Sequence, residues 1–173
     1  MEIKILASVE AVAREGAAII AAAARAAVAG RGRFVPAVSG GQTPWLMLRD
    51  LAGEDVSWNG VYVAQVDERV APAGIRTETS PICARACSSK LCCVPSRSTR
   101  CRVEAPDLEA AASRYAQTLR GIAGSPPLFD LVHLGLGPDG HTASLVPGDP
   151  VLAVTDADVA LTGGLSGGGG GSH

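Results

Sequence analysis

Residues 129–147, with the sequence FDLVHLGLGPDGHTASLVP, constrain the fold more than any other stretch of the chain. They begin with an apolar run over residues 131–136, interrupted only by His133, which is typical of a buried strand. The run ends in a glycine-rich loop that carries Asp139 and His141. An open α/β sheet presents functional groups in this way, just beyond the carboxyl end of a strand. This loop is therefore the first candidate for a functional site.

Three glycines in the loop, Gly135, Gly137 and Gly140, allow backbone conformations and a close approach to a ligand that a Cβ atom would prevent. The same letters also fit a simpler structure, namely a strand, a tight turn and a helix capped by Thr142 or Ser144. The segment by itself does not decide between a catalytic loop and a capped helix.

The rest of the chain alternates between short apolar runs and segments with helical spacing. Ser8 is expected to cap a helix over residues 9–28, with Gly30 as its stop signal. Further helices are predicted at 44–51 and 106–122, and strands at 1–7, 33–38, 61–66, 130–136 and 159–161. This alternation predicts an α/β fold, an open and mostly parallel sheet flanked by helices in the Rossmann-like manner.

The composition excludes several classes of protein. The chain has 173 residues and is 47% hydrophobic, enough for one domain with its own core, and its net charge of -2 suggests no nucleic-acid partner. Its most apolar stretch, residues 17–29, is interrupted by Arg25, so no membrane span is expected. The first ten residues lack the pattern of a secretory signal, which predicts a cytoplasmic location.

A second loop, SGGQTP, leads from a predicted strand into a predicted helix. Backbone N–H groups at such a turn, together with the helix dipole, favour an anion such as a phosphate. Plain turns also contain such glycines. The candidate binding residues of this loop are Ser39, Gly40, Gly41 and Thr43.

The third loop is the tripeptide DER at residues 67–69, after the strand predicted at 61–66. The guanidinium of Arg69 can hold a phosphate through two parallel hydrogen bonds, although a surface ion pair is the simpler interpretation of the tripeptide alone. Because the carboxyl ends of parallel strands line one crevice, the three loops should meet there. Asp139 can orient His141 as a base, so the crevice would hold a small phosphorylated molecule at one end and attack it at the other.

Two rival sites are weaker. A serine triad would need Ser39 or Ser144 and Asp67 around His141, but the chain has no G-x-S-x-G nucleophile elbow. A metal site would need paired ligands, and the histidines lack such spacing; His133 is expected to be an ordinary strand residue. No metal and no cofactor are therefore expected.

Taken together, the motifs SGGQTP, W-x-x-V-Y-V-x-x-V-D-E-R and F-D-L-V-x-L-G-L-G-P-D-G-H-T-A-S-L-V-P-G resemble the 6-phosphogluconolactonase family. The resemblance covers roughly residues 1–74 and 103–162. It implies the α/β fold shared with ribose-5-phosphate isomerase and glucosamine-6-phosphate deaminase. It also implies metal-free hydrolysis of 6-phospho-D-glucono-1,5-lactone to 6-phosphogluconate, in the oxidative pentose phosphate pathway. The related deaminases normally have I-A-F-N after G-H, whereas residues 142–145 read TASL, which favours the lactonase.

The resemblance also implies a role for each site residue. His141 would be the general base that activates water, and Asp139 would support it. Arg69 would neutralise charge. The remaining substrate- and phosphate-binding residues would be Ser39, Gly40, Gly41, Thr43, Asp67, Gly137 and Gly140. The expected partner is a phosphorylated sugar lactone, and the chain is expected to be a monomer without nucleic-acid or membrane partners.

Residues 75–102 depart from this resemblance. They contain all five cysteines of the chain, and their spacing is not that of a zinc ribbon. An Arg/Ser-rich nucleic-acid arm is a further alternative, but the segment lacks aromatic residues and repeats. We favour translation out of frame, because a one-nucleotide shift with assumed codons restores an Asn-bearing loop and a leucine-rich helix. Sequencing of the source DNA tests this hypothesis.

The expected domain organisation follows. Residues 1–162 would form one lactonase-like domain, incomplete at its C-terminus, in which 75–102 are disordered, and residues 163–173 would be a flexible glycine-rich tail. A chain built in this way is expected to be poorly stable and weakly active or inactive.

Overall fold

The computed structural model describes residues 1–40, 42–68, 70, 98, 99, 101, 103 and 105–163, and within this set the side chains of residues 42, 43 and 98 are not described. The predictions of disorder in 75–102 and of a flexible tail fall, for nearly all of their residues, outside these ranges. Cys101 is the one cysteine among the described residues.

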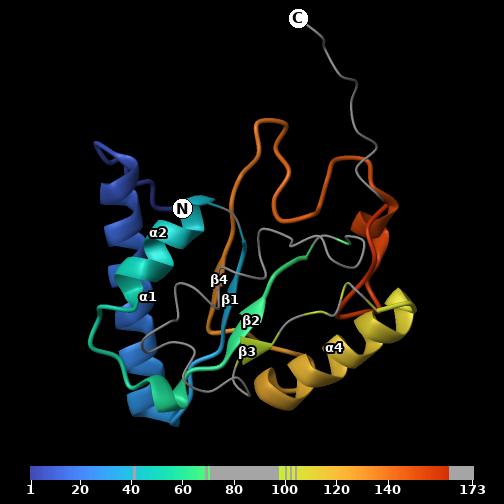
Figure 1. The fold of residues 1–173 in the computed structure, drawn as a ribbon, viewed down its shortest axis with the longest axis horizontal. Helices are drawn as coiled ribbons and strands as arrows, with labels where there is room; N and C mark the ends of the chain where they lie inside the picture. Colours follow the sequence, from blue (N-terminus) through green and yellow to red (C-terminus); the bar gives the residue numbers. More distant parts are fainter. Residues whose placement is uncertain are drawn as a thin grey trace, which may run out of the picture.

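A parallel sheet forms the centre of the molecule (Figure 1). Its strands are β1 (Pro36–Val38), β2 (Val63–Gln65), β3 (Ser98–Thr99) and β4 (Leu131–His133), in the spatial order β3-β2-β1-β4. Each neighbouring pair runs parallel. The predicted α/β fold with an open parallel sheet is thus confirmed, and the strands that precede the three candidate loops all end at one edge of the sheet.

Two predicted strands are absent from the described chain. Residues 1–7 contain no strand, and Ile3 and Ile5 have 72% and 92% of their surface exposed. Residues 159–161 form no strand either. An alternating or apolar run becomes a strand only when a neighbour supplies backbone hydrogen bonds, and neither segment has such a neighbour among the described strands.

Three α-helices are described: α1 (Val9–Arg31), α2 (Gln42–Leu51) and α4 (Leu108–Ala123). Ser8 caps α1 as predicted, since its side chain accepts a hydrogen bond from Ala11 N. The predicted stop at Gly30 is wrong: the helix continues to Arg31 and ends at Gly32, whose φ of 71° is the left-handed conformation that glycine adopts without strain. Short 3-10 helices lie at η1 (Trp58–Gly60) and η3 (Pro150–Ala153).

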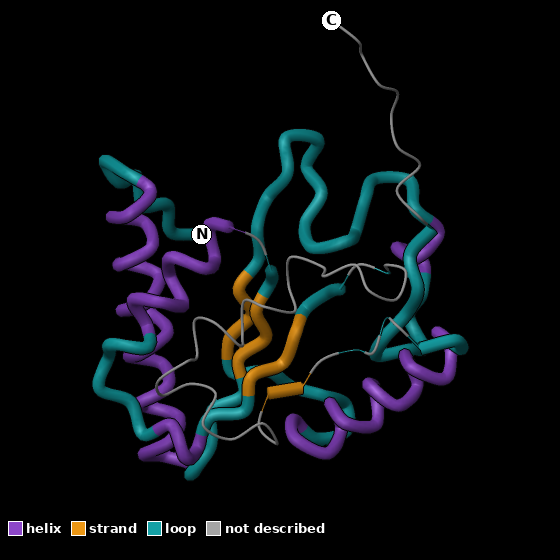
Figure 2. Tube along the Cα trace, in the orientation of Figure 1, coloured by secondary structure: helices purple, strands orange, loops and turns teal. Residues whose placement is uncertain are grey.

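The helices cover both faces of the sheet, with α1 and α2 on one side and α4 on the other (Figure 2). Ala37 and Ala64, which are partners in the β1–β2 register, contact Tyr115 and Leu119 of α4. The opposite core is built mainly from alanines of α1, with Met47, Leu48 and Leu51 of α2. Because Ala and Gly are small, the two helices lie so close that a Cβ at Gly16 would be 2.9 Å from Met47 Sδ.

The apolar run after residue 130 is not a fully buried strand, which corrects that prediction. Strand β4 lies at one end of the sheet order, with β1 as its one described neighbour. Val132 and Leu134 are half exposed, and Leu136 has 83% of its surface exposed. An apolar run does not reveal from sequence alone whether one or both of its edges will be paired. No helix in the described ranges has the length and apolar character needed to cross a bilayer.

Candidate functional site

The ends of β1 and β4 are joined directly by Ser39. This residue follows β1, is buried, and donates two hydrogen bonds to the carbonyl of His133, from its backbone N at 3.2 Å and from Oγ at 3.2 Å. Gly40 comes next, and α2 begins two residues later, so a helix N-terminus stands at the carboxyl edge of the sheet. The predicted contributions of Gly41 and of the Thr43 side chain lie outside the described residues.

The end of β2 is held from two sides. The hydroxyl of Tyr115 accepts a hydrogen bond from Gln65 N and donates one to Gln65 O, both at 2.8 Å. Two residues later, Asp67 Oδ2 accepts a hydrogen bond of 2.5 Å from Ser144 Oγ. Asp67 therefore connects β2 to the loop that follows β4. Arg69 lies outside the described part of the chain.

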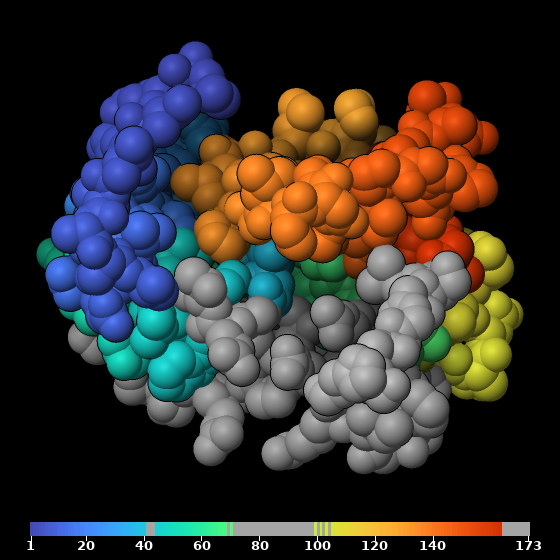
Figure 3. Space-filling model, turned by 90° about the horizontal axis from the view of Figure 1, so that it is seen from above, coloured from blue at the N-terminus to red at the C-terminus, as the bar shows by residue number. Residues whose placement is uncertain are grey.

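The loop after β4 rises above the carboxyl edge of the sheet (Figure 1) and crosses the top of the molecule between the N-terminal region and residues 150–163 (Figure 3). It closes on itself through hydrogen bonds from Gly137 N to His141 O (2.8 Å) and from Gly140 N to Gly137 O (3.0 Å). Thr142 Oγ1 donates to Gly135 O at 2.8 Å. The loop backbone is therefore fixed at several points.

No helix begins at Thr142 or Ser144, so the capped-helix interpretation is wrong; the next helical element is the 3-10 helix η3, which Asp149 caps. The hydroxyls of Thr142 and Ser144 bond to Gly135 O and Asp67 instead of to helical N–H groups. A turn closes between Thr142 and Leu145, with Ala143 at φ 51°. An alanine in the left-handed region carries strain, and strain of this kind is common at functional sites.

His141 and Asp139 form a pair at the tip of the loop. Asp139 Oδ1 lies 2.5 Å from His141 Nδ1 and also accepts a hydrogen bond of 3.2 Å from His141 N. The imidazole side chain is 38% exposed, so the ring is open to solvent. The hydrogen bond from the His141 side chain holds the pKa of Asp139 below its usual value. An ionised carboxylate at Nδ1 fixes the tautomer in which Nε2 can accept a proton.

A crystal structure of a 6-phosphogluconolactonase from Shewanella baltica superposes with a TM-score of 0.78 at 27% identity, over 91% of this chain and 67% of that one. Residues 7–164 match the family described as glucosamine-6-phosphate isomerases/6-phosphogluconolactonase. This chain belongs to that family.

Curated members of the family show how much of a relative the chain represents. A 6-phosphogluconolactonase of Pseudomonas putida is 37% identical over 128 residues, which are 74% of this chain and 51% of that protein. The corresponding enzyme of Mesorhizobium japonicum is 38% identical over 73% of this chain and 52% of its own length. The chain thus spans about half the length of the curated family members that it matches.

The candidate residues of this family member are grouped only in part. The structure brings His141 to Asp139 and places Gly137 beneath the His141 ring, and it ties Asp67 to the same loop. Gly140 adopts a φ of 88° at the loop tip, as the prediction of backbone freedom there requires. Ser39 bonds to β4, not to His141, and Ser144 bonds to Asp67; the described hydrogen bonds therefore give no support to a serine triad.

Two polar side chains that are not among the predicted site residues lie beside this edge. His133 and Gln65 are both partners of Val38 in the sheet register, so they share one face. His133 Nδ1 and Gln65 Oε1 are buried and have no hydrogen-bond partner among the described residues, and burial lowers the pKa of His133. The sequence of one strand predicts which of its own residues share a face. Which residues of two neighbouring strands lie side by side depends on how the strands pair.

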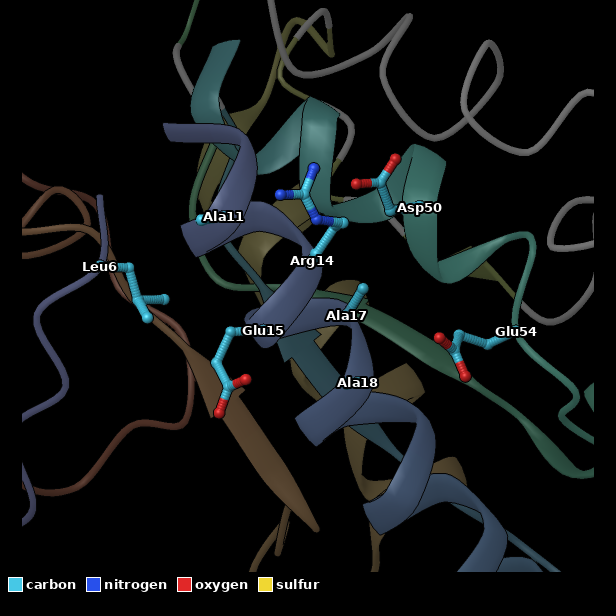
Figure 4. Close-up of a pocket in the computed structure, with 8 residues that line it drawn as sticks. All are labelled: Leu6, Ala11, Arg14, Glu15, Ala17, Ala18, Asp50 and Glu54. Carbon is cyan, nitrogen blue, oxygen red and sulfur yellow. The ribbon is translucent and has the colours of Figure 1, made fainter. Parts of the chain in front are cut away.

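A pocket of about 420 Å³ lies elsewhere, between the N-terminal segment, α1 and α2 (Figure 4). Its charged lining residues are Arg14, Glu15, Asp50 and Glu54. This mixed set of charges contains none of the predicted site residues. Among the described residues, no group of three potential ligands is arranged to hold a metal ion.

Proposed function

We propose that this chain carries the catalytic loop of a 6-phosphogluconolactonase and hydrolyses 6-phospho-D-glucono-1,5-lactone to 6-phospho-D-gluconate, as a step of the oxidative pentose phosphate pathway. The observation that carries the proposal is the pairing of His141 Nδ1 with Asp139 on a loop beyond a parallel strand. The family membership and the named relatives support the choice of substrate.

The chemistry requires a general base, a site that binds the phosphate, and stabilisation of a tetrahedral intermediate. His141 Nε2 takes a proton from water as the water oxygen attacks the lactone carbonyl. Backbone N–H groups stabilise the oxyanion that forms. When the intermediate collapses, the bond from the carbonyl carbon to the ring oxygen breaks, and the imidazolium returns its proton to that oxygen. No redox step and no cofactor are needed.

Asp139 keeps the imidazole oriented through this cycle and stabilises its protonated form. Because hydrogen bonding lowers the pKa of Asp139, the carboxyl is ionised throughout the neutral range, as this role requires. The N-terminus of α2 after Ser39 and Gly40 offers N–H groups to the phosphate. Arg69 and Gly41 are proposed to bind there too.

The test is hydrolysis of the freshly made lactone, corrected for its spontaneous hydrolysis. We expect a low catalysed rate that is abolished by His141→Ala and reduced about 10²–10⁴-fold by Asp139→Asn, the range in which a positioned base contributes. Asp156→Asn, which changes an exposed aspartate that is not among the predicted site residues, is the matched control and should keep the parent rate.

Two outcomes would contradict the proposal. A catalysed rate that survives His141→Ala would remove His141 from the mechanism. Binding of 6-phosphogluconate without any turnover would instead identify a sugar-phosphate-binding protein. We further propose that residues 1–162 form one folding unit and that the chain is monomeric, which size-exclusion chromatography with light scattering tests.

A further inference from the structure

The imidazole of His141 occupies the space that a side chain at Gly137 would need. A Cβ atom built on Gly137 would lie 2.1 Å from His141 Cε1, 2.2 Å from Nδ1 and 2.8 Å from Nε2. All three distances are well inside van der Waals contact. The ring therefore rests directly on the Gly137 backbone, and this contact exists only because residue 137 has no side chain.

The backbone of Gly137 is itself fixed. Its N–H donates to His141 O at 2.8 Å, and its carbonyl accepts from Gly140 N at 3.0 Å. These two bonds hold the residue beneath the ring, while Asp139 Oδ1 holds Nδ1 from the side at 2.5 Å. A side chain at position 137 would therefore move the His141 ring more readily than it would move the backbone of Gly137.

We propose that Gly137 is a positioning residue for His141: its bare backbone is the surface on which the imidazole rests, and this sets the ring orientation in which Nδ1 meets Asp139. This role is separate from the substrate binding that the family resemblance implies for Gly137. Its kinetic consequence rests on the proposed lactonase function, whereas its geometric consequence does not.

Alanine is a clean probe at this position. The φ angle of Gly137 lies outside the left-handed region, unlike those of Gly140 and Gly148, so this angle does not disfavour alanine. The matched control is Gly121→Ala in α4, because a Cβ there meets no atom within 4 Å and its φ is also outside the left-handed region. This variant adds the same methyl group without any contact with His141.

The kinetic experiment compares these two variants with the parent chain. Gly137→Ala is expected to lower kcat about 100-fold, within the range of a lost general base, with KM nearly unchanged. Gly121→Ala should stay within about threefold of the parent. Asp139→Asn combined with Gly137→Ala should cost little more than either change alone, because both disturb the same ring orientation.

A second readout does not depend on activity. In long-range ¹H–¹⁵N NMR spectra, which detect the ring nitrogens through the non-exchanging C–H protons of the imidazole, the His141 Nδ1 bonded to Asp139 should give the resonance of a protonated ring nitrogen in the parent and in Gly121→Ala. This resonance should be lost in Gly137→Ala, with an unchanged urea midpoint as the folding control. Retention of the resonance in Gly137→Ala, or equal kinetic losses in both variants, would overturn the inference. Loss of the resonance in a chain without turnover would refute the lactonase proposal and leave the positioning role intact.

Discussion

Replacement of Tyr115 by phenylalanine removes one oxygen atom and tests how β2 is held. Tyr115 has only 7% of its surface exposed, so its ring remains packed against Ala37 and Ala64 in the variant. The hydroxyl, however, bonds both to Gln65 N and to Gln65 O. Among the described residues, strand β3 pairs with Val63 and Ala64 but not with Gln65, so there the hydroxyl takes the place of a strand partner.

The expected loss follows from these two bonds. A hydrogen bond contributes about 1 kcal/mol net to stability, and a buried group left unpaired costs about 1–3 kcal/mol. Two bonds, in a partly buried setting where water can replace some of the interaction, give a loss of about 2 kcal/mol in the free energy of unfolding. With a urea m-value of about 2 kcal/mol/M, the midpoint should fall by about 1 M.

Urea denaturation followed by circular dichroism measures this shift. The control is Thr118→Val on the same helix, which removes an exposed hydroxyl bonded to Arg114 O at 3.0 Å and should move the midpoint by less than about 0.3 M. Equal shifts for the two variants would refute the idea that the Tyr115 hydroxyl substitutes for a strand. A changed m-value would also refute it, since the loss would then come from the unfolded state or from a changed fold.

Three further predictions concern neighbouring elements. Burial lowers the pKa of His133, so the unfolded chain takes up a proton that the folded chain does not; stability is fully present above about pH 6.5 and should fall as the pH is lowered. His133→Leu should flatten this dependence in thermal melts between pH 7.5 and 5.5, and an unchanged slope would exclude His133 as its source. Ser144→Ala removes a hydrogen bond to the Asp67 carboxylate and should destabilise the chain by about 1.5–3 kcal/mol in urea, whereas a loss below about 0.5 kcal/mol would mean that the bond does not tie the loop to β2. Gly60→Ala would place a Cβ 2.8 Å from the carbonyl oxygen of Gly32 and should lower stability by about 1–3 kcal/mol. An unchanged melting temperature would show instead that the backbone moves aside without cost.

Local features of the structure could be predicted because their causes are local. Ser8 caps α1 through a contact three residues away, and the spacing of apolar residues placed α4 within two residues of its observed bounds. The Asp139–His141 contact spans two residues and needs only the loop. The parallel sheet followed from the alternation of strands and helices, because parallel strands require crossover connections.

The features that could not be predicted depend on partners far away in the sequence. The left-handed conformation that ends α1 at Gly32, and not at Gly30, accompanies the turn of the chain toward the sheet. The absence of strands at residues 1–7 and 159–161, and the exposed edge of β4, depend on which segments pair. Apolar patterns record what a segment can bury, whereas pairing is decided by the rest of the molecule.

The sequence by itself determined the loops, their chemistry and their place at the ends of strands, because spacing within a short segment is enough to set them. Only the tertiary structure decided that Ser144 reaches Asp67 across 77 positions and that Tyr115 closes the end of β2. It also decided that the His141 ring lies against the backbone of Gly137. These contacts arise when separate segments are packed together, and their distances are set by that packing and not by neighbours in the chain.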